Sequence, residues 1–177
     1  MNSFERHCNV ASWSGGWVNL RCYTRAGALA DSALSVLAVH RNHPGTSFVW
    51  NSLATSSGTP PASYAHASDG LPQFVTRTGV VRYSVQLGPE ASPGGHIQVT
   101  AYGSNTYCSV QPSGPLAELW RSRIVNVLCA RGGVPTDSRF SLLGIKRLAV
   151  MGIGPSRTNA PSSQFHLDGD LKYFVMD

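Results

Sequence analysis

Apolar and polar residues alternate one by one along several short stretches of this chain, most clearly at 17–22, 82–87 and 96–102. A period of two places alternate side chains against a core and in water, which is the pattern of a half-buried β-strand. Segments rich in β-branched and aromatic residues extend the expected strands to 34–40, 47–51, 73–78, 124–129, 140–145 and 172–176. Clusters of Gly, Pro, Asn and Ser separate these segments. The pattern predicts an all-β sandwich or barrel.

The chain also repeats part of itself at a distance of about 100 residues. Short matches relate 8–10 to 108–110, 18–22 to 125–129, 30–32 to 136–138, 35–37 to 141–143 and 61–66 to 161–166. In this register 45–145 is one complete β module, and 1–44 plus 146–177 are a split, incomplete second copy. We therefore expect two related β-sandwich-like modules with a pseudo-repeat of about 100 residues.

The two flanks of the chain are expected to pack together. Each flank alone would form an open piece of two or three strands, which is marginal in water and leaves strand edges unpaired. We therefore predict that 18–22 or 34–40 shares a sheet or a core with 172–176.

The four cysteines fall into two pairs, and the two copies of the repeat each contain one pair. Cys8 and Cys22 are 14 residues apart, and Cys108 and Cys129 are 21 apart, which is too wide for a Cys-x-x-Cys redox or zinc motif. Each cysteine lies on or beside a strand-like segment, with a turn between the partners. We predict two disulfides with these pairings, against the alternative of four buried thiols in a reducing compartment.

Composition restricts the classes of partner. With 42% hydrophobic residues the chain can bury a core. Only 13% of its residues are charged, a low share that is frequent in secreted β-proteins. The net charge of +5 comes from scattered arginines without a basic tract, so no nucleic-acid partner is expected. No apolar run is long enough to span a bilayer. Residues 1–10 do not have the pattern of a signal peptide, so secretion implies that a leader has been removed.

Aromatic residues are the strongest candidates for ligand binding. Sugar-binding β-sandwiches stack pyranose rings on exposed Trp or Tyr side chains. The candidate ligand-binding residues are Trp13, Trp17, Trp50, Tyr102 and Tyr107. Trp13 and Trp17 flank a Ser-Gly-Gly turn, where a large ring is difficult to bury completely. The competing interpretation is that these rings, with Trp120, fill the cores.

Histidine offers an alternative site. His66 and His166 are equivalent in the repeat, and each precedes an acidic loop, so either is a candidate catalytic acid/base. An Asp-Gly turn explains the same residues without catalysis. Asp137-Ser138 lacks the frame of a hydroxyl nucleophile and is expected to form a turn. His40 and His43 have no third ligand nearby, so neither a metal site nor a cofactor is expected.

One stretch of the chain resembles a known repeat. The segments Val99-Thr100-Ala101-Tyr102-Gly103, Cys108-Ser109-Val110, 125–129 and 137–140 occur in this order, preceded by Thr-Arg-Thr-Gly at 76–79. This series resembles a repeat of uncharacterised secreted bacterial proteins, over most of 70–145 and less well over 8–40. The first copy lacks the Val-Thr-Ala-Tyr-Gly strand. The resemblance implies an all-β fold and export, and it carries no assigned activity.

The sequence favours a secreted, non-catalytic binding protein whose ligand is a glycan or another cell-surface component. The alternative is an enzyme, a hydrolase or cyclase, with a His-based site between the modules. A second alternative is a structural adhesion or assembly module. Exposed aromatic side chains favour the first reading, a deep pocket around a histidine favours the second, and a flat apolar patch favours the third. The sequence does not set the oligomeric state.

Overall fold

The computed structural model describes residues 6–14, 16–40, 44–88, 95–111, 123–146, 162–166 and 171–176. Strands dominate these residues, and a short 3-10 helix, η1 (Ala62–Tyr64), lies among them. The strands are β1 (Arg6–Ser14), β2 (Trp17–Thr24), β3 (Val36–His40), β4 (Thr46–Asn51), β5 (Ala65–Ala67), β6 (Phe74–Gly79), β7 (Arg82–Gln86), β8 (Gly95–Tyr102), β9 (Tyr107–Gln111), β10 (Ile124–Arg131), β11 (Val134–Pro135), β12 (Arg139–Lys146), β13 (Ser162–His166) and β14 (Leu171–Met176). The predicted all-β class is confirmed.

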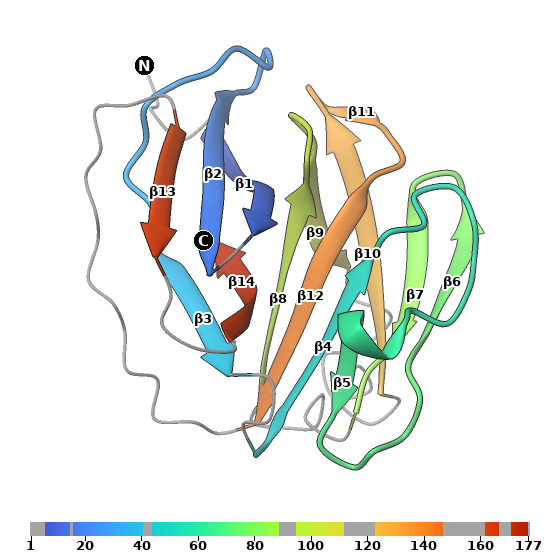
Figure 1. The fold of residues 1–177 in the computed structure, drawn as a ribbon. Coiled ribbons are helices and arrows are strands. Elements are labelled where there is room, and N and C mark those ends of the chain that lie inside the picture. Colours follow the sequence, from blue (N-terminus) through green and yellow to red (C-terminus); the bar gives the residue numbers. More distant parts are fainter. Residues whose placement is uncertain are drawn as a thin grey trace.

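The strands form three sheets (Figure 1). A seven-stranded sheet has the order β13-β2-β1-β8-β12-β4-β5, and a five-stranded sheet has the order β11-β10-β7-β6, with β9 on the other side of β10. A two-stranded sheet pairs β14 with β3. Neighbours in the seven-stranded sheet are antiparallel except β1 and β8, which meet in parallel through Val10 and Tyr102.

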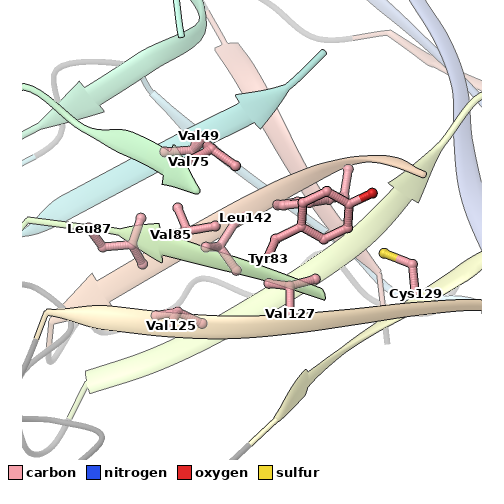
Figure 2. Close-up of a cluster of buried hydrophobic side chains, with 10 residues drawn as sticks. Val49, Val75, Tyr83, Val85, Leu87, Val125, Val127, Cys129 and Leu142 are labelled. Carbon is pink, nitrogen blue, oxygen red and sulfur yellow. The ribbon is translucent and has the colours of Figure 1, made fainter. Parts of the chain in front are cut away.

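The first core lies between the five-stranded sheet and one face of the seven-stranded sheet. Its side chains are apolar and almost fully buried, and along β7 and β10 they alternate with more exposed residues. Figure 2 shows most of them: Val49, Val75, Tyr83, Val85, Leu87, Val125, Val127, Cys129 and Leu142. Phe140 belongs to the same cluster and meets the Tyr83 ring edge-on, with 5.1 Å between the ring centroids.

The opposite face of the seven-stranded sheet has its own apolar clusters. Leu142 belongs to the first core, whereas the next residue, Leu143, packs with Phe48 and Val39. Successive side chains of a strand point to opposite faces, so the sheet carries a core on each side. Val39 comes from β3, which therefore covers this second face (Figure 1). A further cluster around Val10, Val18 and Leu20 extends the same layer over β1 and β2.

The two ends of the described chain are joined as the sequence predicts. Strand β14 pairs with β3 from Met176 opposite Val36 to Leu171 opposite His40. Strand β13 pairs with the outer edge of β2. The expected pairing of 172–176 with 34–40 is therefore confirmed. The division of the chain into two copies of one module stays a prediction.

Both predicted disulfide pairings are present. Cys8 lies directly opposite Cys22 in the β1–β2 pair, and Cys108 lies directly opposite Cys129 in the β9–β10 pair. Each bond therefore joins neighbouring strands of one sheet. The described residues contain no free cysteine.

Candidate functional site

Three of the five candidate ligand-binding residues lie together. Trp13 meets Tyr102 with 4.7 Å between ring centroids, and it meets Trp50 at 5.2 Å. Trp50 is 5.5 Å from Tyr102 and 4.3 Å from Tyr64, a residue of η1 that the sequence did not single out. We call Trp13, Trp50, Tyr64 and Tyr102 the aromatic cluster.

Strand register brings these rings to one face of the seven-stranded sheet. Trp50 lies opposite Ser141, and Tyr102 lies opposite Arg139. Both therefore share the face of Leu143, away from the first core. Trp13 reaches them because β1 bridges β8 at Val10 and Tyr102, three residues before Trp13 and at the last residue of β8. The cluster thus joins 1–44 to 45–145 in space.

All four rings of the aromatic cluster are partly exposed. Their planes are inclined at 62° to 73° to one another, so they pack edge to face and each keeps part of a surface toward solvent. The arrangement is stable by itself, since inclined aromatic pairs contribute about 0.5–1.5 kcal/mol each beyond the area they bury. The sequence left open whether these rings fill a core or bind a ligand. The structure shows rings that pack on one another and are also partly exposed, so ligand binding stays a prediction.

Two buried polar atoms beside the cluster have no hydrogen-bond partner among the described residues. They are the indole Nε1 of Trp50 and the Oγ of Ser141, which lie opposite each other in the β4–β12 pair. A buried donor or acceptor without a partner costs about 1–3 kcal/mol, so such atoms usually meet a water molecule or a ligand. The pair thus holds one N–H donor and one hydroxyl that no described residue satisfies.

Arg139 completes the cluster at its β12 side. Its guanidinium carbon is 5.2 Å from the centroid of the Tyr102 ring, within the range of a cation–π contact. The residue is exposed to solvent. Arg139 and Tyr64 were both missed by the sequence analysis. Arg139 directly follows the repeated Asp-Ser segment, but no period marks it, and η1 has no pattern that would have found Tyr64.

Trp17 and Tyr107 lie apart from the cluster. Trp17 is 43% exposed at the turn between β1 and β2. Its neighbour Val18 is buried in a core, so the Trp17 side chain lies on the opposite face of the strand pair. Tyr107 is 37% exposed and meets His7, with 5.5 Å between the rings. The five candidates therefore do not form one site. Trp120 lies outside the described residues.

His66 lines a hollow of about 330 Å³ at the outer edge of the seven-stranded sheet. Its ring stacks on Phe48 at 5.7 Å. Asp69, in the acidic loop that follows, accepts a hydrogen bond from the Leu71 amide and one from Arg123, so its carboxylate serves a turn and an ion pair. The turn interpretation of this loop fits these contacts. The side chain of His166 lies outside the described residues, and its strand, β13, is at the opposite edge of the sheet.

Asp137 is the centre of a polar network that meets the first core at the Tyr83 hydroxyl. Its carboxylate accepts hydrogen bonds from Arg77 and the Val81 amide, and it lies 3.1 Å from the Tyr83 hydroxyl. The bond from Arg77 lowers the pKa of Asp137, while burial raises the pKa of Tyr83 to about 12. Ser138 is buried and donates to the Arg139 carbonyl. Asp137 therefore serves long-range contacts with residues 54 to 60 positions away, whereas the sequence predicted a local turn.

Comparison with protein-family models, with curated proteins and with solved structures found no match. Within the described ranges, no helix is long and apolar enough to cross a membrane. No group of three or more His, Cys, Asp or Glu side chains able to hold a metal ion occurs in the part of the chain that the structure describes. The function therefore has to be argued from the site itself.

Proposed function

We propose that this chain is a secreted, non-catalytic binding protein that takes a carbohydrate at the aromatic cluster. The observation that carries the proposal is the convergence of four partly exposed rings, from β1, β4, β8 and η1, around an unpartnered indole N–H. A pyranose ring combines an apolar C–H face with a rim of hydroxyl groups. Aromatic faces suit the first and placed polar atoms suit the second.

The chemistry of the two unpartnered atoms supports the same ligand class. A sugar hydroxyl is both a donor and an acceptor, so a single hydroxyl, directly or through a water molecule, can satisfy Trp50 Nε1 and Ser141 Oγ. A purely apolar ligand would leave both atoms unpartnered. Three of the four rings also lie on strands, which limits the entropy lost when a ligand orders their side chains.

The two disulfides support the proposed secretion. Two bonds between neighbouring strands form and persist in an oxidising environment and are rare in the reducing cytosol. The resemblance of 70–145 to a repeat of secreted bacterial proteins supports export as well. A cell-surface or environmental glycan is the ligand that fits such a location.

Affinity electrophoresis in gels that contain soluble polysaccharides tests the proposal. We expect at least one polysaccharide to retard the protein, and we expect Trp13→Ala and Tyr64→Ala to restore much of the free mobility. Trp17→Ala is the matched control, because Trp17 is an exposed tryptophan on the other face of the same hairpin. Equal loss of retardation in the control and the two cluster variants would show that the polysaccharide does not bind at the aromatic cluster.

An enzyme remains the second candidate because His66 borders a hollow large enough for a small ligand. In that case His66 acts as the acid/base group, and Gln73, whose side-chain amide donates to the His66 carbonyl, positions its strand. His66→Ala should then abolish an activity while the melting temperature changes little. A variant that keeps full activity, or that loses only stability, excludes this candidate.

A further inference from the structure

Arg139 is held in place at the cluster, and no carboxylate of the described residues neutralises it. One side of its guanidinium faces the Tyr102 ring. Another side lies so close to the Gly103 backbone that a Cβ atom at Gly103 would approach Nη2 to 2.9 Å. Gly103 also has a φ of +82°, a conformation that glycine adopts without strain. The turn after β8 therefore has both the space and the backbone geometry that keep Arg139 beside the ring.

The described residues as a whole carry an excess of positive charge. The described residues include eight arginines but only three aspartates and no glutamate. Asp137 pairs with Arg77 and Asp69 pairs with Arg123, so two of the three carboxylates are already neutralised. Among the described residues, no carboxylate lies within ion-pair distance of Arg139. An exposed, positioned guanidinium in such surroundings attracts an anion.

We propose that the ligand of the aromatic cluster is an acidic polysaccharide, whose anionic group pairs with Arg139 while a sugar ring lies on the aromatic side chains. The inference rests on the proposed carbohydrate binding and names the class of sugar. The planar fork of a guanidinium matches two oxygens of a carboxylate or a sulfate, and the contact with Tyr102 holds the fork toward the cluster. The ring and the acid group would thus be recognised a few ångströms apart, by neighbouring strands β8 and β12.

Titration calorimetry with matched polymers tests this assignment. We use polygalacturonate against its methyl ester for the carboxylate, and dextran sulfate against dextran for the sulfate. The wild-type chain should bind one acidic polymer at least tenfold more tightly than its neutral counterpart, since a hydrogen-bonded pair with a charged group is typically worth a factor of ten or more. The acidic polymer that binds identifies the anionic group.

Substitutions then assign the preference to Arg139. Arg139→Gln should lose the tenfold preference, and Arg139→Lys should recover part of it, because lysine keeps the charge but lacks the fork. Arg82→Gln is the control. It removes the same charge from an exposed side chain of β7, which belongs to the five-stranded sheet. The affinity of the wild-type chain should fall as salt rises, and that fall should be smaller in Arg139→Gln than in the control.

The outcomes separate the inference from the proposed function. Equal affinity for acidic and neutral polymers, lost in Trp13→Ala, overturns the acidic preference and leaves carbohydrate binding in place. Equal losses in Arg139→Gln and Arg82→Gln also overturn the inference, since the attraction would then come from net charge alone. Absence of binding to all four polymers, together with absence of retardation in the gels, overturns both.

Discussion

Arg77 and Asp137 form a two-point ion pair across 60 positions of sequence, with Nη2 2.7 Å from Oδ2 and Nε 3.3 Å from Oδ1. The same carboxylate accepts the amide of Val81 at 2.8 Å. Val81 has a φ of +62°, which is unfavourable for a β-branched residue. The Val81 carbonyl in turn accepts the amide of Cys129. The Arg77–Asp137 pair therefore holds the β6–β7 turn in a strained conformation, next to the residues that precede β12.

Loss of Asp137 should destabilise the fold. Asp137→Ala removes the partner of the Arg77 guanidinium and of the Val81 amide, and we expect the free energy of unfolding to fall by about 2 kcal/mol. Asp31, which corresponds to Asp137 in the predicted repeat, provides a matched control, and Asp31→Ala should change stability by less than about 0.5 kcal/mol. Urea unfolding measures both. Similar losses in the two variants would show that the network does not hold the turn.

Acid should weaken the same network. The pKa of Asp137 is lowered in the folded chain, chiefly by the hydrogen bond from Arg77, so the folded state favours the ionised form. This contribution is complete above the ordinary carboxyl pKa of about 4 and is lost as the pH falls through the lowered value. We expect Asp137→Asn to have a flatter loss of stability below pH about 4 than the wild-type chain. Parallel curves would contradict this account.

His7 should add a second pH dependence at higher pH. Burial lowers its pKa, although a hydrogen bond with the Asn105 backbone acts in the opposite direction. Its Nε2 has no hydrogen-bond partner among the residues that the structure describes, and its ring stacks on Tyr23 at 5.6 Å. The unfolded chain therefore takes up a proton first, and stability present above pH about 6.5 should be lost as the pH falls below it. Melting temperatures between pH 5 and pH 7.5 measure this, and His7→Phe should flatten the curve in that window.

The disulfides should contribute strongly to stability. Removing either bond, by Cys8→Ser with Cys22→Ser or by Cys108→Ser with Cys129→Ser, should cost about 3 kcal/mol, because loops of 14 and 21 residues regain entropy in the unfolded chain. Mass spectrometry of unreduced peptides checks the pairing directly. Four free thiols, or a bond between Cys8 and Cys108, would contradict both the pairing and the oxidising compartment.

The hydrophobic pattern predicted several of the strands that border a core but missed others, β1 and β9 among them. The segments 82–87 and 124–129 correspond closely to β7 and β10, since each has one buried and one solvent-facing side. Strand β9 was not predicted, because its residues after Tyr107 are all partly buried and show no period of two. Strand β11 has only two residues, both exposed, so no core imposes a pattern on it.

The candidate site was predictable in its chemistry and not in its geometry. Residue type alone singled out Trp13, Trp50 and Tyr102, and the structure brings these three together. Their meeting depends on the parallel contact of β1 with β8, between segments more than 90 positions apart, which no local pattern encodes. Trp17 has the same residue type and lies near Trp13 in sequence, yet strand register turns it to the other face of the hairpin.

The most direct test of the account is the response of the tryptophan indole N–H signals in a nitrogen–proton correlation spectrum during titration with a bound oligosaccharide. The chain has four tryptophans, and single Trp→Phe variants assign their signals. We predict that the Trp50 signal shifts most, since its N–H gains a partner, that Trp13 shifts with the same saturation curve, and that Trp17 stays in place. Shifts at Trp17 without shifts at Trp13 and Trp50 would contradict binding at the aromatic cluster.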